Sequence, residues 1–317
     1  MKQTQLTALI PVFNEEKYIS PLLSSLNTAL PPDSEIFVMD GGSTDSTKEK
    51  ISLFNKAGFA LNVIDNPKRF VSHGFNLIYP QSQGQYICLL GAHAEYPVDF
   101  FRSGLNYLEK DECDAVGGPL IQKGKSETGK AIAYCMSTKF GVGDTEFRTE
   151  TKKMYVDSVA FAIYKREIFE KVGLLDEELI RNQDDELHYR INAAGLRILM
   201  VPEMACVYYV RDTLRGLFKQ YFQYGLYKPL VFKKVRKGIR LRHLIPSLFV
   251  LYVFSLPFMI WRPFWGIFLV VYIGLTTHFS FNNALNLKQK FICLLTFPTL
   301  HLSYGLGFLL GLRKIIR

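Results

Sequence analysis

The stretch Glu35–Asp45, EIFVMDGGSTD, decides the predicted fold of this 317-residue chain. Its first half is an apolar run of the kind that forms a buried β-strand. The two glycines that follow let the backbone turn tightly and approach a ligand. Ser43, Thr44 or Asp45 can cap the next helix, and the N-terminus of a helix favours a phosphate group. Taken alone, the motif is equally well explained as a plain strand–turn–helix connection.

A second motif of the same kind precedes it in the chain. Leu6–Glu16, LTALIPVFNEE, is an apolar run that ends in Asn14 and two glutamates. Asn14 and Asp40 lie 26 residues apart at the ends of successive predicted strands, and the pair is far more specific than either motif alone. Asp40, at the tip of its strand, is placed to accept hydrogen bonds from a nucleobase or a ribose.

The first 120 residues alternate short apolar runs with amphipathic segments. This alternation predicts an α/β fold with a mostly parallel sheet covered by helices on both faces. Ligands of such sheets bind beyond the carboxyl ends of the strands, where Asn14, Glu15, Asp40 and Asn66 stand. The predicted strands are Leu6–Phe13, Glu35–Asp40, Leu61–Asp65, Gln85–Leu90 and Ala115–Leu120, and the predicted helices are Glu15–Ala29, Thr44–Ala57, Val71–Tyr79 and Pro97–Glu109.

Beyond residue 120 the pattern is less regular. Gly124–Thr151 is polar and weakly patterned, which predicts a long loop with one helix near Gly129–Thr138. Loops of this length are often functional lids or binding loops. The remaining expected elements are a strand at Tyr155–Tyr164, helices at Lys165–Val172 and Asp185–Ala194, and a strand at Arg197–Val201.

Charge divides the chain into two parts. The formal net charge is +9, yet the first 212 residues hold all 29 acids and 23 bases, while Thr213–Arg317 contain 15 bases and no acid. This asymmetry argues against a nucleic-acid-binding protein, which would carry bases over its whole surface. It indicates a mildly acidic catalytic domain, residues 1–212, followed by a basic and apolar tail that faces anionic lipid.

The tail contains an amphipathic and basic segment, residues 213–243, and then three apolar stretches. Each stretch is close to the ~20 residues that cross a bilayer, and buried core helices are the alternative interpretation. The three stretches are Leu244–Trp261, Pro263–Phe281 and Phe291–Leu312, which place a membrane domain at residues 244–317.

The positive-inside rule does not settle the number of spans. The basic cluster Lys233–Arg242, together with Lys288 and Lys290, places its side of the membrane in the cytoplasm. Three full crossings would then leave Arg313 and Lys314 outside, against the rule. The first hairpin is the doubtful one because of its prolines and short connection, and the expected number of transmembrane helices stays at two or three.

The cysteines and the N-terminus favour a cytoplasmic catalytic domain. The five cysteines are scattered and form no C-x-x-C pair, so reduced thiols are expected in place of a disulfide scaffold or a zinc ribbon. No basic region followed by an apolar run stands at the N-terminus, so no signal peptide is indicated.

At these motifs the sequence resembles the family-2 glycosyltransferases, which have the GT-A fold. PVFNEE and DGGSTD match the two N-terminal nucleotide-binding signatures of that family, and Asn66 to Asn76 fits the segment that follows them. The resemblance implies that Asp40 holds the nucleobase. It also implies a nucleotide-sugar site formed by Pro11, Phe13, Asn14, Glu15, Asp40, Gly42, Asn66, Asn76, Gly91 and Ala92.

The stretch Gly91–Pro97, GAHAEYP, stands where the family carries a D-x-D motif whose second acid binds a divalent cation. A branch of succinoglycan-type exopolysaccharide glycosyltransferases carries D-A-H-A before Tyr-Pro, which the chain matches except that Gly91 replaces the first acid. His93 then stands at the metal position, and imidazole suits Mn²⁺ better than Mg²⁺. Glu95 shares a face with His93 if the strand continues. The alternative is that His93 and Glu95 bond a loop and bind no metal.

A second chemical motif, Arg181–Arg190, RNQDDELHYR, matches the block that carries the catalytic base in this family. By that resemblance Asp184 takes the proton from the acceptor hydroxyl. Helical spacing predicts Asp184 on the inward face and Asp185 further outward, with an N-cap as the alternative role of Asp184. Glu186 precedes Arg190 by four residues and is spaced to pair with it. Asp157 and Asp185 are candidates for acceptor binding.

The segment Gln220–Gly225, QYFQYG, resembles the glutamine- and aromatic-rich segment that covers the diphosphate and acceptor in membrane-bound relatives. Gln220 and Tyr224 are the candidate contacts. The segment lacks the Arg-Trp end found in processive synthases, which favours transfer of a single residue. An interfacial amphipathic helix is the alternative, and both roles are compatible.

The resemblance implies an inverting hexosyltransferase of the cytoplasmic face of a bacterial inner membrane. The expected donor is a UDP-sugar, the cofactor is Mn²⁺ or Mg²⁺, and the acceptor is a polyprenyl-diphosphate-linked saccharide held among membrane lipids. Gly91 motivates a rival, a glycosyltransferase-like scaffold or partner subunit that has lost turnover. A soluble dinucleotide enzyme is excluded because no G-x-G-x-x-G follows the first strand.

Overall fold

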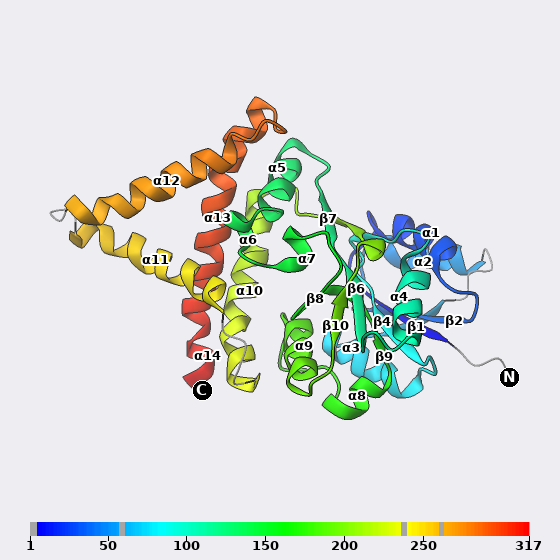
Figure 1. The fold of residues 1–317 in the computed structure, drawn as a ribbon. Helices are drawn as coiled ribbons and strands as arrows, with labels where there is room; N and C mark the ends of the chain where they lie inside the picture. Colours follow the sequence, from blue (N-terminus) through cyan, green and yellow to red (C-terminus); the bar gives the residue numbers. More distant parts are fainter. Residues whose placement is uncertain (1–4, 57–60, 236–239, 260–262, 317) are drawn as a thin grey trace. The chain divides into compact units, whose positions relative to one another are not determined.

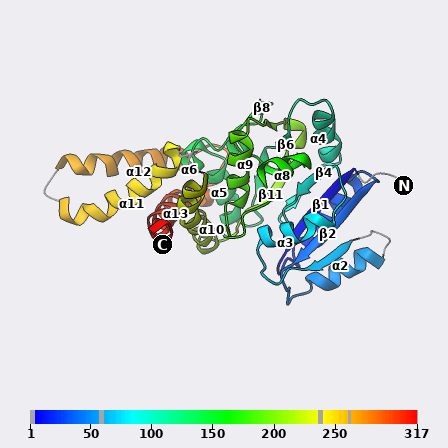
Figure 2. The ribbon, with the colours of Figure 1, turned by 90° about the horizontal axis from the view of Figure 1, so that it is seen from below.

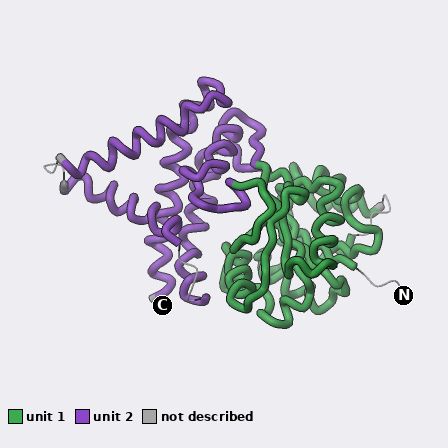
Figure 3. Tube along the Cα trace, in the orientation of Figure 1, with its two compact units in different colours: residues 1–121, 150–208 green, residues 122–149, 209–317 purple. Residues whose placement is uncertain are grey.

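The computed structural model describes residues 5–56, 61–235, 240–259 and 263–316 (Figure 1, and from below in Figure 2). These residues form two compact units (Figure 3). The first comprises Met1–Ile121 and Glu150–Tyr208, and the second comprises Gln122–Thr149 and Tyr209–Arg317. Residues 122–149, which we expected within the N-terminal domain, thus group with the C-terminal part of the chain. Residues 236–239 of the basic cluster lie outside the described residues.

The first unit is built on a mixed sheet of eight strands with the order β3-β2-β1-β4-β9-β6-β10-β8. Neighbours among β1, β2, β3 and β4 are parallel, and β6 pairs in parallel with β10. The expectation of a mostly parallel sheet is therefore confirmed. The strands are β1 (Leu6–Val12), β2 (Ser34–Asp40), β3 (Asn62–Asp65), β4 (Tyr86–Leu89), β6 (Ala115–Gly118), β8 (Met154–Tyr155), β9 (Ala160–Lys165) and β10 (Ile198–Met200).

Burial explains why these segments form the sheet and its helical layers. Leu6, Leu9 and Ile10 of β1 are fully buried, as expected for a central strand covered on both faces. Helix α3 packs against β1 and β2, and α4 packs against β6 and β9. Helix α9 packs against β10. The helices of the unit are α1 (Ile19–Ala29), α2 (Thr47–Lys56), α3 (Val71–Ile78), α4 (Phe100–Glu109), α8 (Glu167–Val172) and α9 (Gln183–Ala193).

Strand β9 determines which segments meet at the site. It runs antiparallel between β4 and β6, with Cys88 opposite Ile163. Because of this direction, β9 begins at the sheet edge where the parallel strands β1, β2 and β4 end. The residues just before β9 are thereby brought to the same edge as the two glycine- and asparagine-containing turns.

Two expectations for the middle of the chain are wrong, the long loop at Gly124–Thr151 and the single strand at Tyr155–Tyr164, whereas the helix expected near Gly129–Thr138 is present. Gly124–Thr151 is mostly helical, with α5 (Glu127–Met136), α6 (Lys139–Val142) and α7 (Glu146–Thr149). Its helices are short and start at local caps, because the hydroxyls of Ser126 and Thr138 accept hydrogen bonds from Gly129 N and Gly141 N. The strand expected at Tyr155–Tyr164 is divided into β8 and β9. The sequence also did not reveal a second sheet, β5-β11-β7, formed by β5 (Ala94–Glu95), β7 (Leu120–Lys123) and β11 (Cys206–Tyr209).

The second unit is helical. Helix α13 packs against α10, α11 and α5, and Figure 1 shows α11 and α12 spreading apart from the point where the chain connects them. Two helical segments, Leu241–Phe258 and Leu287–Ile315, are long and apolar enough to cross a membrane, and the apolar helix at Phe264–Ser280 is shorter. The C-terminal helices are α10 (Leu214–Val235), α11 (Leu241–Met259), α12 (Gly266–Ser280), α13 (Leu287–Gly311) and α14 (Arg313–Ile316).

Candidate active site

The turns after β1 and β2 are bonded to each other. Asn14 adopts a left-handed φ of 56°, which asparagine tolerates better than most residues. Its side-chain oxygen accepts a hydrogen bond from Thr44 N at 2.8 Å, and its own N–H donates to the Ser43 hydroxyl at 3.0 Å. Glu15 N donates to the Thr47 hydroxyl at 2.8 Å. The PVFNEE and DGGSTD motifs therefore form one rigid rim, as their joint occurrence in the sequence indicated.

The carboxylate of Asp40 organises this rim from inside. Asp40 is fully buried and accepts hydrogen bonds from Gly42 N at 3.2 Å and from the Ser43 hydroxyl at 2.6 Å. Lys48 Nζ lies 3.1 Å from the same group. Burial raises the pKa of Asp40, but the hydrogen bonds from Ser43 and Lys48 outweigh it and hold the pKa below the ordinary value. The carboxylate thus shapes the loop, and its direct contact with a nucleobase stays a prediction.

Arg69 is a candidate site residue that the sequence analysis missed. Its guanidinium lies over the Phe13 ring, 4.9 Å from the ring centroid, and its Cα and side chain border Gly41. Phe13 is 43% exposed, so this cation stands at the open side of the rim. The only sequence signal was a pair of bases, Lys68 and Arg69, directly after the third strand.

The other predicted nucleotide-site residues of the first three strands lie at or near the same edge. Gly42 has a φ of 79°, which favours glycine. Asn66 is buried and donates from its amide nitrogen to Phe70 O at 2.9 Å, while its side-chain oxygen has no hydrogen-bond partner among the described residues. Pro11 is half-buried in β1, opposite Met39.

His93 meets Glu15 across the edge of the sheet. His93 Nε2 lies 3.1 Å from Glu15 Oε1, and the side chains are 17% and 16% exposed. The Tyr18 ring packs on the imidazole with centroids 4.3 Å apart. One imidazole nitrogen and one carboxylate therefore converge at a partly open position beside the nucleotide rim. Both groups are ligand types that Mn²⁺ accepts.

Strand β4 does not continue through His93 and Glu95, so the condition under which the two side chains would share a face is not met. Strand β4 ends at Leu89, a turn closed by Ala94 N donating to Gly91 O follows, and Glu95 lies in β5 of the second sheet, paired with Val207. Ala92 is buried in this turn. The turn forms because Gly91 N donates to the buried Tyr96 hydroxyl at 2.9 Å. No group of three or more His, Cys, Asp or Glu side chains suited to a metal occurs among the described residues.

Gly91 has a packing reason to be glycine. A Cβ at this position would overlap the ring of Phe161. Phe161 adopts a φ of 52°, which is rare for an aromatic residue and indicates that its position is enforced by its surroundings. The aromatic ring thus fills the space beside Gly91 that the first acid of a D-A-H motif would need.

We expect Gly91→Asp to destabilise the protein by about 1–3 kcal/mol, because overpacking a filled site costs that much. Phe161→Ala in the same chain should recover much of this loss, which a double-mutant cycle of thermal unfolding in detergent would measure. Strictly additive effects of the two substitutions would contradict the overlap.

The start of α9 places the predicted base at the open side. Asn182, with a φ of 63°, is the N-cap residue of α9, so an N-cap role for Asp184 is excluded. Asp184 is exposed, whereas Asp185 is half-buried and accepts a hydrogen bond from the Ser158 hydroxyl at 3.2 Å. Because Ser158 precedes β9, this bond ties the first turn of α9 to the edge where β1, β2 and β4 end.

The predicted orientation of α9 is wrong in its first turn. Leu187, His188 and Ile191 are buried as expected, but Glu186 is buried with them and Asp184 is not. Glu186 is drawn inward by Arg190, whose Nη2 lies 2.7 Å from Glu186 Oε2. The Arg190 guanidinium also donates to Leu174 O at 2.8 Å. The expected Glu186–Arg190 pair is thus confirmed.

The predicted sugar-site residue Asn76 fastens the chain segment that precedes α9. Its amide nitrogen donates to Leu175 O at 2.8 Å and its oxygen accepts from Leu175 N at 3.1 Å. Glu177 is held by Lys68 at 2.9 Å and by His73 at 3.2 Å. Helix α3 therefore positions the approach to Asp184, and the place of Asn76 below a sugar stays a prediction.

A buried polar chain supports Asp185. His188 Nδ1 lies 3.0 Å from the Ser158 hydroxyl, and His188 Nε2 lies 2.8 Å from the Tyr164 hydroxyl. Burial lowers the pKa of His188 to about 4, against a smaller raising effect of Asp185. The imidazole is therefore neutral at physiological pH and links Ser158 to the centre of the sheet.

His188 should make the protein less stable in acid. Between pH 6.5 and 4 the unfolded chain binds a proton that the folded chain does not, so stability falls as the pH decreases. From pH 7 to pH 5 we expect a loss of about 2 kcal/mol from this group. His188→Gln should flatten the dependence of the unfolding temperature on pH over this range. An unchanged slope in the variant would show that His188 is not the responsible group.

The remaining acceptor candidates belong to different units of the structure. Asp157 stands before β9 in the first unit, and its carbonyl accepts a hydrogen bond from the Asn192 side chain at 2.9 Å. Gln220 and Tyr224 lie one turn apart on α10 of the second unit, with Gln220 Nε2 donating to the Tyr224 hydroxyl at 3.0 Å. Their roles stay predictions.

The edge of the sheet thus carries a glycine-containing loop, a His–Glu pair and a helix start rich in carboxylates, which defines a nucleotide-sugar enzyme of the GT-A class. A family model described as "Glycosyl transferase family 2" matches residues 7–173, more than half of the chain. The chain belongs to glycosyltransferase family 2 and is a glycosyltransferase that uses a nucleotide-sugar donor.

Two curated relatives and one solved structure illustrate the similarity. The chain is 32% identical over 249 residues to the succinoglycan biosynthesis protein ExoA of Rhizobium meliloti (strain 1021), covering 78% of this chain and 76% of that protein. It is 28% identical over 238 residues, 72% of this chain and 74% of that protein, to the dolichyl N-acetyl-alpha-D-glucosaminyl phosphate 3-beta-D-2,3-diacetamido-2,3-dideoxy-beta-D-glucuronosyltransferase of Methanococcus voltae.

The structure of the mannosyltransferase PcManGT from Pyrobaculum calidifontis, in complex with GDP-Man and Mn²⁺, superposes with a TM-score of 0.70 at 17% identity. It covers 98% of this chain and 87% of that chain. The expected GT-A fold and the membership of the exopolysaccharide branch of the family are confirmed.

Proposed function

We propose that the protein is an inverting glycosyltransferase that moves a single sugar from a UDP-sugar to a membrane-held, lipid-linked saccharide in exopolysaccharide or surface-glycan synthesis. The R. meliloti relative is named for succinoglycan biosynthesis, and the name of the M. voltae relative describes transfer to a dolichyl-linked sugar phosphate. The first name supports a role in exopolysaccharide synthesis, and the second supports a lipid-linked acceptor. The acceptor proposed here is a polyprenyl-diphosphate-linked saccharide at the cytoplasmic face of the inner membrane.

The donor site of this proposal is the joined rim of the two turns. Asp40 holds the loop through Gly42 and Ser43, and Phe13 and Arg69 form the wall on its open side. A flat aromatic ring suits a nucleobase, and a guanidinium suits a phosphate. Asn66, whose buried side-chain oxygen has no partner in the described residues, remains a predicted residue of the nucleotide site.

The residues present fit a divalent cation with partial protein ligation. His93 and Glu15 supply one nitrogen and one oxygen at a partly open position, and the diphosphate of the donor would complete the coordination. The structure of GalNAc-T7, which has a TM-score of 0.52 to this chain, contains UDP and Mn²⁺. A bound cation supplies charge neutralisation of the departing diphosphate. The imidazole favours Mn²⁺ over Mg²⁺, and Glu95 is a less direct ligand candidate because it lies in a different sheet.

Asp184 is the proposed general base. The acceptor oxygen attacks the anomeric carbon as its proton passes to the Asp184 carboxylate, and the bond from that carbon to the diphosphate oxygen breaks with the electron pair leaving on the nucleotide. One displacement inverts the anomeric centre and requires no covalent enzyme intermediate. Asp185, held by Ser158, and Asp157 orient the acceptor, and Gln220 and Tyr224 of the second unit stay predicted acceptor contacts.

The observation that carries the proposal is the convergence at one sheet edge of the nucleotide rim, the His93–Glu15 pair and the start of α9. The test is an assay of the detergent-solubilised full chain with Mn²⁺, a panel of UDP-sugars and GDP-mannose, and a polyprenyl-diphosphate-linked saccharide. We expect UDP release coupled to product formation, with inversion shown by NMR of the product. UDP binding without turnover on any donor and acceptor would favour the scaffold rival, and product of retained configuration would contradict the displacement.

A further inference from the structure

Exposed apolar side chains of the second unit gather on two helices. On α11 they recur at helical spacing, with Leu248 59%, Leu251 52% and Phe254 65% exposed. On α12 they lie around the helix, where Phe268 is 62% and Val270 70% exposed. A soluble protein rarely exposes an apolar surface that extends over two helices. These two helices therefore need an apolar environment that the chain itself does not supply.

The two helices form an antiparallel hairpin. The rings of Phe249 and Tyr272 stack with centroids 4.2 Å apart. Nearer the tip, the Tyr252 hydroxyl donates to Trp265 O at 2.8 Å, and Trp265 Nε1 donates to the Ser255 hydroxyl at 2.9 Å. Helix α11 has 19 residues and α12 has 15. At a rise of ~1.5 Å per residue, α11 approaches the ~30 Å of a hydrocarbon core, and α12 is shorter. The sequence places Trp261 and Arg262 at the connection, and such residues favour a membrane interface.

Helix α13 has a different environment, although its sequence is equally apolar. No residue from Thr296 to Gly311 is exposed. A Cβ at Gly307 would overlap the Phe222 carbonyl oxygen, and one at Gly311 would overlap the Leu226 carbonyl oxygen. The glycines thus let α13 pack backbone to backbone on α10. Gly307 lies against Phe222 and Gly311 against Leu226. Residue numbers therefore rise in the same direction along both helices, and α10 and α13 run parallel.

The partner of α13 is too polar for a lipid environment. Helix α10 carries Arg215, Lys219, Lys228, Lys233 and Lys234 among its 22 residues. Lys228 stands beside Phe232, in the middle of the stretch that packs on α13. If α13 crossed the bilayer, α10 would have to cross with it, and charged side chains in hydrocarbon are strongly disfavoured. These contacts argue for α13 as a core helix of the second unit and against it as a membrane span.

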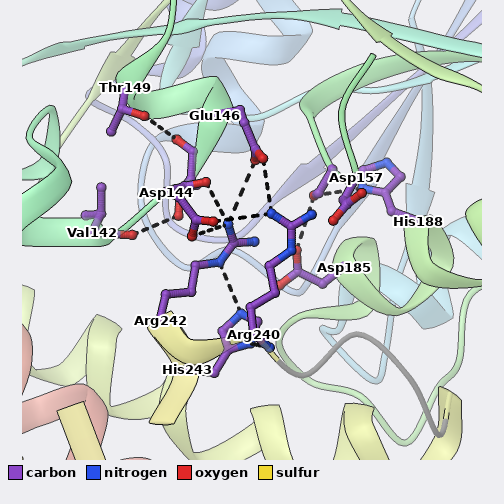
Figure 4. A network of polar contacts seen from close by, with 12 residues as sticks. Val142, Asp144, Glu146, Thr149, Asp157, Asp185, His188, Arg240, Arg242 and His243 are labelled. Atoms are coloured by element: carbon purple, nitrogen blue, oxygen red, sulfur yellow. Dashed lines mark hydrogen bonds and ion pairs between the residues drawn. The ribbon is translucent and has the colours of Figure 1, made fainter. Parts of the chain in front are cut away.

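Polar contacts hold both feet of the hairpin. At the start of α11, Arg242 Nη1 lies 2.8 Å from Asp144 Oδ1, and Arg240 Nη1 lies 3.2 Å from Glu146 Oε1 (Figure 4). After α12, the Asn286 side chain donates to Glu127 Oε2 at 2.7 Å. Asp144, Glu146 and Glu127 all belong to the 122–149 segment. Both feet are thus bonded to carboxylates of the same segment.

The C-terminus lies beside the end of α10. Lys233 Nζ donates to Ile315 O at 2.9 Å, and Lys314 Nζ lies over the Tyr227 ring, 3.8 Å from its centroid. Lys233 and Lys234 precede the hairpin in the chain. The last basic residues are therefore on the same side as the bases before α11.

We propose that the α11–α12 hairpin is the membrane-inserted element of this protein, crossing the bilayer twice, while α13 stays outside and the C-terminus returns to the side of the catalytic unit. This topology places Lys288, Lys290, Arg313 and Lys314 on the same side as Lys233 and Arg242, which satisfies the positive-inside rule. It removes the conflict that three crossings create. The partner of the exposed apolar surface is the bilayer, and the basic residues at the feet of the hairpin meet anionic headgroups.

The test is labelling of single cysteines by a membrane-impermeant maleimide in sealed vesicles of known orientation. The native cysteines are all buried, and unsubstituted protein serves as the blank. The variants are Glu49→Cys in α2 as the catalytic-side reference, Phe264→Cys at the tip, Asn283→Cys between α12 and α13, and Arg313→Cys after α13. We expect the cysteines of Asn283→Cys and Arg313→Cys to be labelled from the same side of the membrane as the cysteine of Glu49→Cys. The cysteine of Phe264→Cys should be labelled from the opposite side.

Each other pattern overturns the proposal. Arg313→Cys labelling with Phe264→Cys would mean that α13 crosses. Asn283→Cys labelling with Phe264→Cys would mean that α12 does not cross. Phe264→Cys labelling with Glu49→Cys would mean that the hairpin does not traverse the bilayer.

A second measurement tests the hairpin as the anchor. Phe254→Glu combined with Phe268→Glu should shift most of the protein to the supernatant of an alkaline membrane wash. Leu53→Glu is the matched control, since Leu53 on α2 is exposed to a similar degree, 58%, and should leave the distribution unchanged. Full retention of the double variant in the membrane fraction would contradict the anchor role.

Discussion

Asp184→Asn is expected to lower kcat by about 10²–10⁴-fold, the usual contribution of a positioned general base. The substitution keeps the size of the side chain and removes its capacity to take the acceptor proton. The KM for the nucleotide sugar should change little, because Asp184 lies at the start of α9 and the nucleotide rim is formed by the turns after β1 and β2. Steady-state kinetics with the lipid-linked acceptor, and UDP binding measured separately, would show this division.

Asp185→Asn is the matched control for this prediction. Asp185 is half-buried and bonded to Ser158 at 3.2 Å, whereas Asp184 is exposed. We expect the Asp185 variant to raise the KM for the acceptor more than it lowers kcat. If Asp185→Asn abolished turnover and Asp184→Asn left kcat within tenfold of the native value, the base would be Asp185, and the resemblance-based assignment would be wrong.

His93→Ala is expected to raise the Mn²⁺ concentration needed for half-maximal activity by at least tenfold, since losing even an outer-shell partner of a metal ligand costs about 10–100-fold in affinity. His93 Nε2 and Glu15 Oε1 are the two groups that converge beside the rim. Mn²⁺ binding in the presence of UDP, followed by the loss of the free-ion EPR signal, provides a measurement that does not depend on turnover.

The chain offers a matched control and a complementary variant. His73, on α3, has a similar exposed fraction, 18%, and its Nδ1 lies 3.2 Å from Glu177 Oε2. His73→Ala should therefore leave the Mn²⁺ dependence unchanged. His93→Asp should shift the preference toward Mg²⁺, because a carboxylate suits that ion better than imidazole does. Equal Mn²⁺ affinity in the native protein and in His93→Ala would show that His93 only bonds Glu15.

Local sequence patterns predicted most of the sheet. The strands at Leu6–Phe13 and Glu35–Asp40 were found to within a few residues, because an apolar run that ends in a turn motif is recognisable without knowledge of its neighbours. The segment Gly124–Thr151 was misjudged for the opposite reason. Its helices have weak hydrophobic periodicity, and they are specified by caps such as Ser126 and by packing on α13, which no local pattern reveals.

The site was predicted as a set of residues but not as a set of contacts. Asn14, Glu15, Asp40, His93 and Asp184 were all identified from motifs. Their interactions were not, since the His93–Glu15 pair joins residues 78 positions apart in the chain. The inward turn of Glu186 likewise depends on Arg190 bonding the carbonyls of Gly173 and Leu174. Arg69 escaped notice because its contact with Phe13 exists only after β1 and β3 are placed in one sheet.

The apolar stretches of the tail likewise show what sequence patterns can predict and what depends on tertiary packing. By composition, Leu244–Trp261 and Phe291–Leu312 are equivalent, and both pass a test of length and hydropathy. In the structure α11 exposes its apolar face, while α13 buries its second half against α10 through glycine contacts. Hydropathy measures whether a segment avoids water, and it does not say whether protein or lipid replaces the water.

The sequence by itself determined the class of fold, the identity of the turn residues and the division into an acidic and a basic part, because these depend on neighbours a few positions away. Tertiary structure alone decided that Phe161 occupies the space beside Gly91, that His93 faces Glu15 and that α13 lies against a charged helix. Those facts arise from packing between segments distant in the chain, where volume and hydrogen-bond geometry select one arrangement among many that the same residue pattern allows.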